Sequence, residues 1–468
     1  MNDLARRIVD VLGLDPSVNA VEFDGVWTTW GELGDVARQV AALVPAPGAQ
    51  IGIILRNRPV FVGAILGVLS ADGCVVTINP GRGRDRTRDD IAGLEVDALI
   101  GLAEDLEELV APDTSVTTAA IIGSQLSVTA RSTAAPHREG IAVRMLTSGT
   151  TGPPKRIDLR YETFEKVMVG AKHYESNQDA TVRLRNGVAI INAPLVHVGG
   201  LFRVLQCITD GRSFALLDKF SVLAWLDVVR RHRPATASLV PTALRMVLDA
   251  DLDPADLSSL RSIISGTAPL DPEDADAFHK KYGIPVLVSY GATEFAGGVA
   301  GWNIKDHAAF WETKKGSVGR AHPGCELRVV DDVLEVKAAQ LGRDWVRTTD
   351  LARIDADGFL WILGRADRAI IRGGFKVLPE DVRQALERHP AVRLAAVVGR
   401  DDRRLGSVPV AALELKDAAT IEQLAQYAST VLAKYEIPVE FRIVDALPRT
   451  DSGKVDLSAV DAMFASQD

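Results

Sequence analysis

The sequence has few cysteines, no excess of basic charge and no long hydrophobic run, and each shortage excludes a class of protein. Its 468 residues include only Cys74, Cys207 and Cys325, whose wide separation argues against a disulfide framework or a zinc site. The formal net charge is −9, whereas general nucleic-acid binding needs a basic surface that displaces counterions. The longest apolar run, Val60–Leu69, is half of the roughly 20 residues that a membrane-spanning helix needs.

The N-terminal stretch MNDLARRIVDVLG also lacks the apolar core and cleavage site of a signal peptide. We therefore expect a cytoplasmic protein that neither binds nucleic acid nor inserts into a membrane. Hydrophobic residues make up 47% of the chain, so a large core is possible. A chain of this length exceeds what a single core supports, which predicts two or more domains.

Short apolar runs alternate with amphipathic segments over the first two thirds of the chain. The pattern predicts a buried strand at 51–55, a helix at 59–73 and a strand at 74–80 that stops at Asn79-Pro80. The alternation continues with predicted strands at 187–194, 235–240, 260–265 and 285–290, and predicted helices at 221–232, 241–250 and 271–283. Such alternation indicates an α/β fold with mostly parallel sheets, which bind ligands beyond the carboxyl ends of their strands.

After about residue 330 the pattern changes to short antiparallel strands. Asp357-Gly358 and Gly373-Gly374 are predicted hairpin turns. A helix is predicted to begin at Pro379, followed by strands at 393–399 and 408–415 and a helix near 420–433. This composition indicates a small α+β unit, joined to the preceding part near 364–368.

The stretch MLTSGTTGPPKRI (145–157) contains too many glycine, proline and hydroxyl residues for a regular helix or strand. Its glycines let backbone N–H groups approach an anion, its hydroxyls add donors, and Lys155 adds positive charge. The spacing is not that of the G-x-x-x-x-G-K-[ST] nucleotide loop. Taken alone, the stretch is explained equally well as a phosphate site or as a plain linker.

Four more motifs accompany this stretch, and together they carry a family resemblance. The five, in order, are TSGTTGPPK (147–155), YGATE (290–294), RTTD (347–350), GRADRAIIRGGFKVLPE (364–380) and PRTDSGK (448–454). In this order and spacing the sequence resembles the adenylate-forming superfamily of acyl- and aryl-CoA synthetases, peptide-synthetase adenylation domains and beetle luciferases. The resemblance extends from about residue 28 to Lys454.

The resemblance implies two domains. The first, residues 1–366, would be a large N-terminal adenylation domain of α/β layers with mostly parallel sheets and a β-barrel-like subdomain. The second, residues 367–468, would be a small, mobile α+β lid domain that carries the catalytic lysine. Asp367 would be the hinge between them.

The resemblance also implies an ATP site. The phosphate loop would comprise Thr147, Ser148, Gly149, Thr150, Thr151, Gly152 and Lys155. The segments around adenine would comprise Gly266, Thr267, Ala268, Tyr290, Gly291 and Ala292. Asp350 and Arg365 would contact the ribose.

Four residues would carry the chemistry. Glu294 would bind Mg²⁺, which prefers hard oxygen ligands, and Thr293 would lie near the α-phosphate. Lys454 would bridge the substrate carboxylate and the α-phosphate. His197 would lie beside the acyl carbonyl, although a hydrogen-bonded core or helix-end histidine explains it equally well. Alone, Glu294 could cap a helix and Lys454 could be a solvated charge; the joint occurrence of the motifs favours the catalytic roles.

For the acceptor, Gly373 and Gly374 would leave room for a thin pantetheine chain. Arg403 and Arg404 are weaker candidates for contacts with CoA phosphates. The arginine-rich stretch 81–90 is most simply a solvated loop.

The acyl pocket is expected at positions that are mainly apolar and small, with no obvious cation. Besides His197, they are Val198, Leu201, Val240, Ser265, Phe295, Ala296 and Gly298. This composition predicts an aromatic, alicyclic or medium-chain monocarboxylic acid as substrate, in preference to acetate or a diacid.

The predicted function is an ATP-dependent acid–thiol ligase that forms acyl-AMP and pyrophosphate and then transfers the acyl group to CoA, acting as a monomer or homodimer. The sequence ends 14 residues after Lys454 without a carrier domain, which favours CoA as the acceptor. The alternatives are an acyl-AMP ligase that serves a carrier protein or an amine and, disfavoured by the intact motifs, a nucleotide-binding non-enzyme. Thr349, Arg156 and Ile371 depart from the usual family residues.

Overall fold

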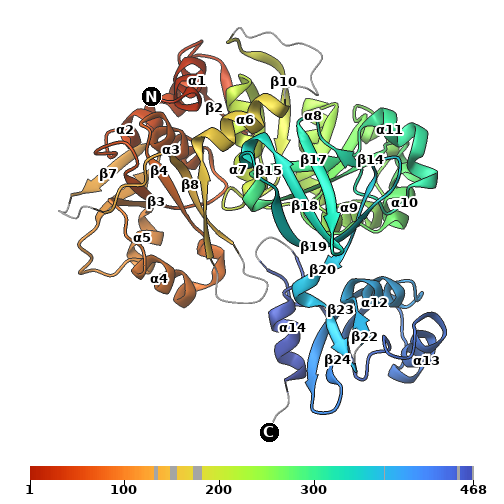
Figure 1. Cartoon of the computed structure of the whole chain (residues 1–468). Helices are drawn as coiled ribbons and strands as arrows, with labels where there is room; N and C mark the ends of the chain where they lie inside the picture. The colour runs from red at the N-terminus through yellow and green to blue at the C-terminus, as the bar shows by residue number, and fades with distance from the viewer. Residues whose placement is uncertain (131–134, 148–154, 172–181, 374, 451–453, 466–468) are drawn as a thin grey trace.

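The computed structural model describes residues 1–468 except 131–134, 148–154, 172–181, 374, 451–453 and 466–468. The described residues form five sheets. In Figure 1 the last part of the chain, coloured blue, forms a smaller unit below a larger N-terminal part.

A seven-stranded sheet in the order β7-β6-β5-β3-β4-β8-β9 forms the first layer of the N-terminal part. Its strands are β3 (Gln50–Ile54), β4 (Cys74–Ile78), β5 (Ala98–Leu102), β6 (Thr117–Ile122), β7 (Gln125–Thr129), β8 (Ile141–Thr147) and β9 (Lys155–Arg160). All but the two edge strands run parallel. Every residue of β3 and β4 is buried, as the apolar runs predict. The helices of this layer are α2 (Trp30–Ala41), α3 (Pro59–Ser70), α4 (Arg84–Ala92) and α5 (Ala103–Leu109).

Two further sheets complete the α/β core of the N-terminal part. One has the order β10-β11-β1-β2 and comprises β1 (Asn19–Phe23), β2 (Val26–Thr29), β10 (Arg185–Ile191) and β11 (Arg212–Leu216). The other comprises β12 (Thr236–Ser238), β13 (Ser262–Ser265), β14 (Val286–Ala292), β15 (Gly297–Gly301) and β16 (Arg320–Ala321), of which the first three run parallel. The helices around them are α1 (Asp3–Leu12), α6 (Tyr161–Ala171), α7 (Val198–Thr209), α8 (Val222–His232), α9 (Pro241–Asp249), α10 (Pro272–Tyr282) and α11 (Ile304–Phe310).

An antiparallel sheet follows where the sequence pattern changes. Its strands are β17 (Cys325–Val330), β18 (Val333–Ala338), β19 (Val346–Ile354) and β20 (Leu360–Arg365). The hairpin turn predicted at Asp357-Gly358 joins β19 to β20.

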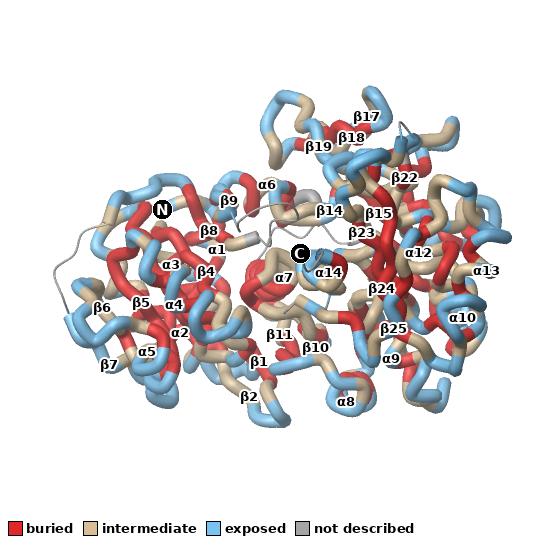
Figure 2. Tube along the Cα trace, turned by 90° about the horizontal axis from the view of Figure 1, so that it is seen from below, coloured by how far each residue is buried: buried red, intermediate tan, exposed pale blue. Residues whose placement is uncertain are grey.

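The short helix η7 (Ala366–Arg368) connects β20 to what we call the C-terminal unit, which begins at Ile370. It comprises β21 (Ile370–Arg372), β22 (Phe375–Val377), β23 (Val392–Asp402), β24 (Gly406–Leu415), β25 (Phe441–Val444), α12 (Pro379–Glu387), α13 (Ile421–Val431) and α14 (Leu457–Phe464). Buried side chains cluster separately on the two sides of η7. Four clusters draw only on residues up to 362, and two only on residues from 370 onward. Figure 2 shows the buried segments inside each part, with exposed segments around them.

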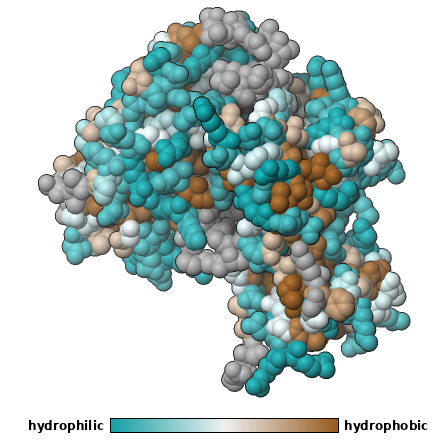
Figure 3. Space-filling model, viewed as in Figure 1, coloured by the Kyte–Doolittle hydropathy of each residue, from teal (hydrophilic) through white to brown (hydrophobic). Residues whose placement is uncertain are grey.

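The surface facing the viewer in Figure 3 is mainly hydrophilic, and its hydrophobic residues lie in small separate groups. Among the helices that the structure describes, none combines the length and apolar character needed to cross a bilayer.

Helices α2 and α3 pack so closely that a glycine is required between them. A Cβ atom at Gly67 of α3 would lie 2.5 Å from the Ala37 carbonyl oxygen and 2.8 Å from Val40 Cβ, both on α2. Gly34 of α2 is different: its nearest obstacle is the Arg38 Nη1 atom at 3.3 Å. That arginine side chain is 73% exposed and can move away.

We predict that Gly67→Ala lowers the midpoint of thermal unfolding by about 2 to 8 °C, because overpacking of a rigid contact costs roughly 1–3 kcal/mol. Gly34→Ala is the matched control, since alanine is the better helix former and finds room there. Circular dichroism measures both variants. Equal midpoints for the two variants would show that the α2–α3 contact is not rigid.

Candidate active site

A cavity of about 3460 Å³ lies between the N-terminal part and the C-terminal unit. Both parts contribute to its wall, which includes α7 and the ends of β9, β13 and β14 on one side and Lys454 and α14 on the other. Ligand pockets usually have volumes of about 300–1,000 Å³, so this cavity has room for more than one small molecule.

The predicted phosphate loop joins two paired strands at the cavity. Thr147, the last residue of β8, pairs with Lys155, the first residue of β9. Lys155 is exposed on the cavity wall. Ser148, Gly149, Thr150, Thr151 and Gly152 lie outside the described residues, as does the side chain of Thr147.

Arg156, one of the departures from the family pattern, anchors the strand that follows this loop. Its Nη2 atom lies 2.7 Å from Asp90 Oδ2, and its Nη1 donates to the Thr77 carbonyl at 2.9 Å. Burial lowers the pKa of Arg156 even though Asp90 counteracts the shift. The side chain therefore ties β9 to β4, which lies on the other side of β8 in the sheet, and to α4.

The predicted adenine segments follow the ends of neighbouring parallel strands. Gly266, Thr267 and Ala268 come directly after β13, and Tyr290 to Ala292 end β14; all of them line the cavity. Thr267 has φ +71°, a left-handed conformation that is uncommon for a residue other than glycine. A Cβ atom at Gly291 would lie 2.2 Å from the Gly297 carbonyl oxygen, so this position between β14 and β15 requires glycine.

A hydrogen-bonded group at the predicted ribose site joins three strands. The Tyr290 hydroxyl donates to Asp350 Oδ2 at 2.5 Å, and burial together with this carboxylate raises the pKa of Tyr290. Asp350 of β19 lies opposite Arg365 of β20, whose Nη1 is 3.9 Å from Asp350 Oδ1. Arg365 also donates twice to Asp367, at 2.9 Å each. Asp350 is thus held with its carboxylate on the cavity wall.

Thr293 and Glu294 belong to the short helix η4 (Thr293–Phe295), directly after β14. Both line the cavity, and Glu294 is exposed there. Within the described ranges, no group of three or more His, Cys, Asp or Glu side chains could hold a metal ion. A single carboxylate suits Mg²⁺, which commonly keeps water ligands and takes the rest from substrate phosphates.

Lys454 and His197 come from different parts of the protein and face the same cavity. His197 precedes α7, and its buried Nε2 atom has no hydrogen-bond partner among the described residues. Burial and the nearby Lys454 charge lower the pKa of His197 to about 4, so its ring is neutral at pH 7. Lys454 keeps access to solvent in the cavity, and the surrounding protein atoms and Arg368 lower its pKa.

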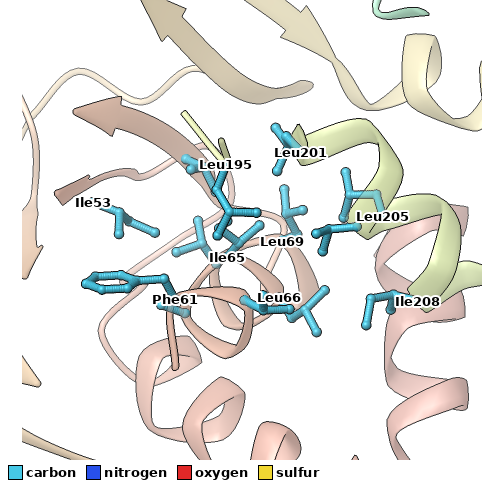
Figure 4. Packing of buried hydrophobic residues seen from close by; sticks show 14 of the residues in the cluster. Ile53, Phe61, Ile65, Leu66, Leu69, Leu195, Leu201, Leu205 and Ile208 are labelled. Carbon is cyan, nitrogen blue, oxygen red and sulfur yellow. The ribbon is translucent and has the colours of Figure 1, made fainter. Parts of the chain in front are cut away.

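The residues predicted for the acyl wall divide into two groups. Val198, Val240 and Gly298 line the cavity. Leu201, Ser265, Phe295 and Ala296 do not, because their exposure is 3% or less and their side chains are buried inside the protein. Figure 4 shows Leu201 in the core beside α3, in the same cluster as Leu205 and Ile208. The expectation that these four residues form the pocket wall is therefore wrong for this structure.

Two basic residues of the wall were missed by sequence reasoning. His322 lies against the pocket glycines, with its Nε2 3.2 Å from where a Cβ of Gly298 would be, and burial lowers its pKa to about 4. Arg203 lies on α7 and lines the cavity. His322 belongs to no motif, so no signal in the sequence points to it. Arg203 follows Gly199 by four residues, and residues at this spacing lie on the same face of a helix, so its position could have been inferred.

The predicted CoA residues lie elsewhere. Gly373 is not on the cavity wall; its N–H donates to the Leu405 carbonyl at 2.7 Å. The β21–β22 hairpin is therefore next to the turn that carries Arg403 and Arg404. Gly374 lies outside the described residues.

Comparison with known proteins agrees with this arrangement of segments. The profile of the AMP-binding enzyme family matches residues 13–353, and that of the AMP-binding enzyme C-terminal domain matches residues 381–454. The chain belongs to the AMP-binding enzyme family. The resemblance to adenylate-forming acyl- and aryl-CoA synthetases is thereby confirmed, and with it the class of AMP-forming acid–thiol ligases.

Relatives with curated names include two CoA ligases. A 2-succinylbenzoate–CoA ligase of Bacillus velezensis is 30% identical over 492 residues, 94% of each chain. An indoleacetate–CoA ligase of Aromatoleum aromaticum is 32% identical over 340 residues, 66% of this chain and 64% of the relative.

Solved structures of similar fold include an o-succinylbenzoate CoA synthetase of Bacillus subtilis in complex with its acyl-adenylate intermediate. The TM-score is 0.81 at 25% identity, covering 99% of this chain and 98% of that one. An amide bond synthetase of Marinactinospora thermotolerans has a TM-score of 0.80 at 25% identity, covering 98% and 99%. The predicted fold class is confirmed.

The buried His322 predicts a specific sensitivity to acid. Its pKa of about 4 lies below the ordinary value of roughly 6.5, so the unfolded chain binds a proton that the folded protein excludes. The stability that depends on neutral His322 is complete above pH 6.5 and is lost as the pH falls towards 4. We predict that His322→Gln loses less thermal stability than the wild type between pH 6.5 and 4.5.

Thermal unfolding measured at intervals of half a pH unit tests this difference. A His322→Gln curve parallel to the wild-type curve would contradict the assignment.

Proposed function

We propose that the protein activates a carboxylic acid with ATP as an acyl-adenylate and then transfers the acyl group to the thiol of CoA, releasing AMP. The observation that carries this proposal is the placement of Lys454, from the C-terminal unit, in the same cavity as His197, Glu294 and Asp350. The named CoA ligases among its relatives support the same reaction.

ATP would lie along the cavity wall between β9 and β19. Lys155 and the loop before it would hold the β- and γ-phosphates, and the segments after β13 and within β14 would enclose adenine. Asp350 would accept hydrogen bonds from the ribose hydroxyls. The hydrogen bond from Tyr290 occupies one carboxylate oxygen of Asp350 and so fixes the direction of the group.

Glu294 would hold Mg²⁺, which when bound supplies positive charge that neutralises the phosphates. A related synthetase of known structure is in complex with ATP and a magnesium ion. Thr293 precedes Glu294 on η4 and would place its hydroxyl near the α-phosphate.

Adenylation needs alignment and charge neutralisation more than an acid or a base. A carboxylate oxygen is a poor leaving group. When it attacks the α-phosphate of ATP, the bond to the β-phosphate breaks and pyrophosphate leaves, and AMP becomes the leaving group of the later acyl transfer. Lys454 would lie between the carboxylate and the α-phosphate and neutralise the charge that develops there. His197, which is neutral, would contact the acid without adding a second positive charge beside Lys454. A closed cavity would protect the acyl-adenylate from water.

We place the domain boundary at 366/367 and the hinge at Asp367. The separate hydrophobic cores on the two sides of η7 support this boundary, and the Arg365–Asp367 ion pair lies at the joint. Turning about this joint would withdraw Lys454 and present the β21–β22 hairpin with Gly373 for the thioester step. Arg403 and Arg404 move with this hairpin and would contact CoA phosphates.

The two half-reactions should respond to different substitutions. We predict that Lys454→Ala reduces acid-dependent ATP–pyrophosphate exchange at least about 100-fold, because one charge-stabilising group of the transition state is removed. Asp367→Pro, which fixes a backbone angle at the joint, should retain exchange and lose thioester formation. Lys434→Ala removes an exposed lysine of the same unit and is the control. Full exchange in Lys454→Ala, or equal loss of both half-reactions in Asp367→Pro, would refute the respective role.

The acceptor has a second candidate, since one similar structure is an amide bond synthetase. AMP release with CoA, a phosphopantetheinylated carrier protein or a primary amine as the sole acceptor separates the candidates. We expect rapid release with CoA alone. Release with the carrier or the amine alone would assign the protein to the corresponding ligase class.

A further inference from the structure

Arg203 lies on the cavity wall and has no carboxylate partner in the described part of the chain. Its Nη1 donates to Gln206 Oε1 at 2.5 Å. Its Nε is buried and has no hydrogen-bond partner, and no ion pair among the described residues includes Arg203. A partly buried cation in this state is stabilised by an anion that enters the cavity.

The surroundings of Arg203 leave room for such an anion. Gly199, Arg203, Gln206 and Asp210 follow one another along one face of α7, and all line the cavity. A Cβ atom at Gly199 would meet nothing within 4 Å, so the space next to this face is open. Asp210, the acidic residue of the face, already lies 3.9 Å from Arg185 Nη2.

The remaining wall is apolar between the two ends of this space. Val198 precedes Gly199, and Phe202 and Val167 approach the position that a Cβ of Gly297 would take. The substrate would therefore meet an apolar surface in the middle and Arg203 at the far end. His322, which lies next to Gly298, is kept neutral by burial and does not supply a second positive charge.

Helix geometry gives the distance between the two ends. His197 and Arg203 are six residues apart at the start of α7, which corresponds to about 9 Å along the helix axis. In the proposed function the reacting carboxyl group lies beside His197 and Lys454. A group that reaches Arg203 is separated from that carboxyl by an aromatic ring or by a chain of several carbons.

Resting on the proposed function, we propose that Arg203 binds a second anionic group of the substrate. The favoured substrate class is then a carboxylic acid with a carboxylate or sulfonate at the far end of an apolar spacer. The planar guanidinium offers paired donors to such a group. This assignment replaces the sequence-based expectation of a monocarboxylic acid, which assumed a pocket without a cation.

Matched pairs of acids test the assignment. The pairs are heptanoate with heptanedioate, and 3-phenylpropanoate with 3-(4-carboxyphenyl)propanoate; within each pair only the second anion differs. Pyrophosphate release gives kcat/KM for each acid. We expect the wild type to prefer the dianionic member of at least one pair by at least about 100-fold, as sites built for a polar group reject analogues that lack it.

Arg203→Met should abolish this preference by lowering kcat/KM for the dianionic acid, and Arg203→Lys should restore part of it. The control is Arg230→Met, which removes an arginine paired with Asp256 at 2.6 Å on α8, outside the cavity wall. A rise in thermal midpoint with ATP shows that each variant is folded.

The outcomes separate the two proposals. A wild type that activates the monoanionic members equally well, or an unchanged preference in Arg203→Met, overturns the role of Arg203 and leaves the proposed function intact. A wild type that releases no pyrophosphate with these acids or with a broad panel of monocarboxylic acids overturns both.

Discussion

The proposed site depends on the ammonium group of Lys454. This residue belongs to the C-terminal unit, but it reaches a cavity whose wall also includes segments of the N-terminal part. Lys454 is held locally, because the Thr450 N–H donates to its carbonyl oxygen at 2.7 Å and Arg449 pairs with Val455 as an isolated bridge. Contacts between the two parts include polar ones, such as Arg245 Nη1 with the Arg393 carbonyl at 3.1 Å and Arg449 Nη1 with Thr242 Oγ1 at 3.3 Å. Water can replace such contacts at little cost, so the lysine can approach and leave without disturbing either core.

The basic groups of the cavity suit the anionic ligands that the proposed function requires. Burial disfavours the charged forms of His197 and Lys454, and Arg203 contributes a cation on the same wall. A low-dielectric space with several basic groups favours anions, and both ATP and a carboxylate are anions. Acidic residues also line the cavity, and among them Glu294 and Asp350 lie where a cation and a hydroxyl donor are expected.

The backbone could be predicted from the sequence because strand and helix periods are local signals. The buried strands at 51–55 and 74–80, the helix from Pro379 and the turn at Asp357-Gly358 occur as expected. The segments proposed to bind the nucleotide could be expected to lie together, because motifs at the ends of neighbouring parallel strands meet at one edge of a sheet. Whether an individual side chain faces the cavity or the core was harder to predict from the sequence. Leu201 and Phe295 stand among small and apolar residues whose pattern does not tell a pocket wall from a core.

Long-range partners could not be predicted at all. Arg156 was a departure of unknown consequence until Asp90, 66 residues earlier in the chain, was seen to pair with it. His322 gains its character only from burial against Gly298 and Gly301. Arg203 belongs to none of the five motifs, and its place on the cavity wall is what suggests a role.

The separation of the hydrophobic cores at η7 has a consequence for variation of this protein. Substitutions far apart and without shared partners change stability independently. Side chains of the proposed acid pocket, such as Val198, Arg203 and Val240, belong to the N-terminal part, whereas Lys454 and the β21–β22 hairpin belong to the C-terminal unit. Changes of acid preference can therefore accumulate without altering the packing of the unit that delivers the lysine, so selectivity and turnover are separable traits.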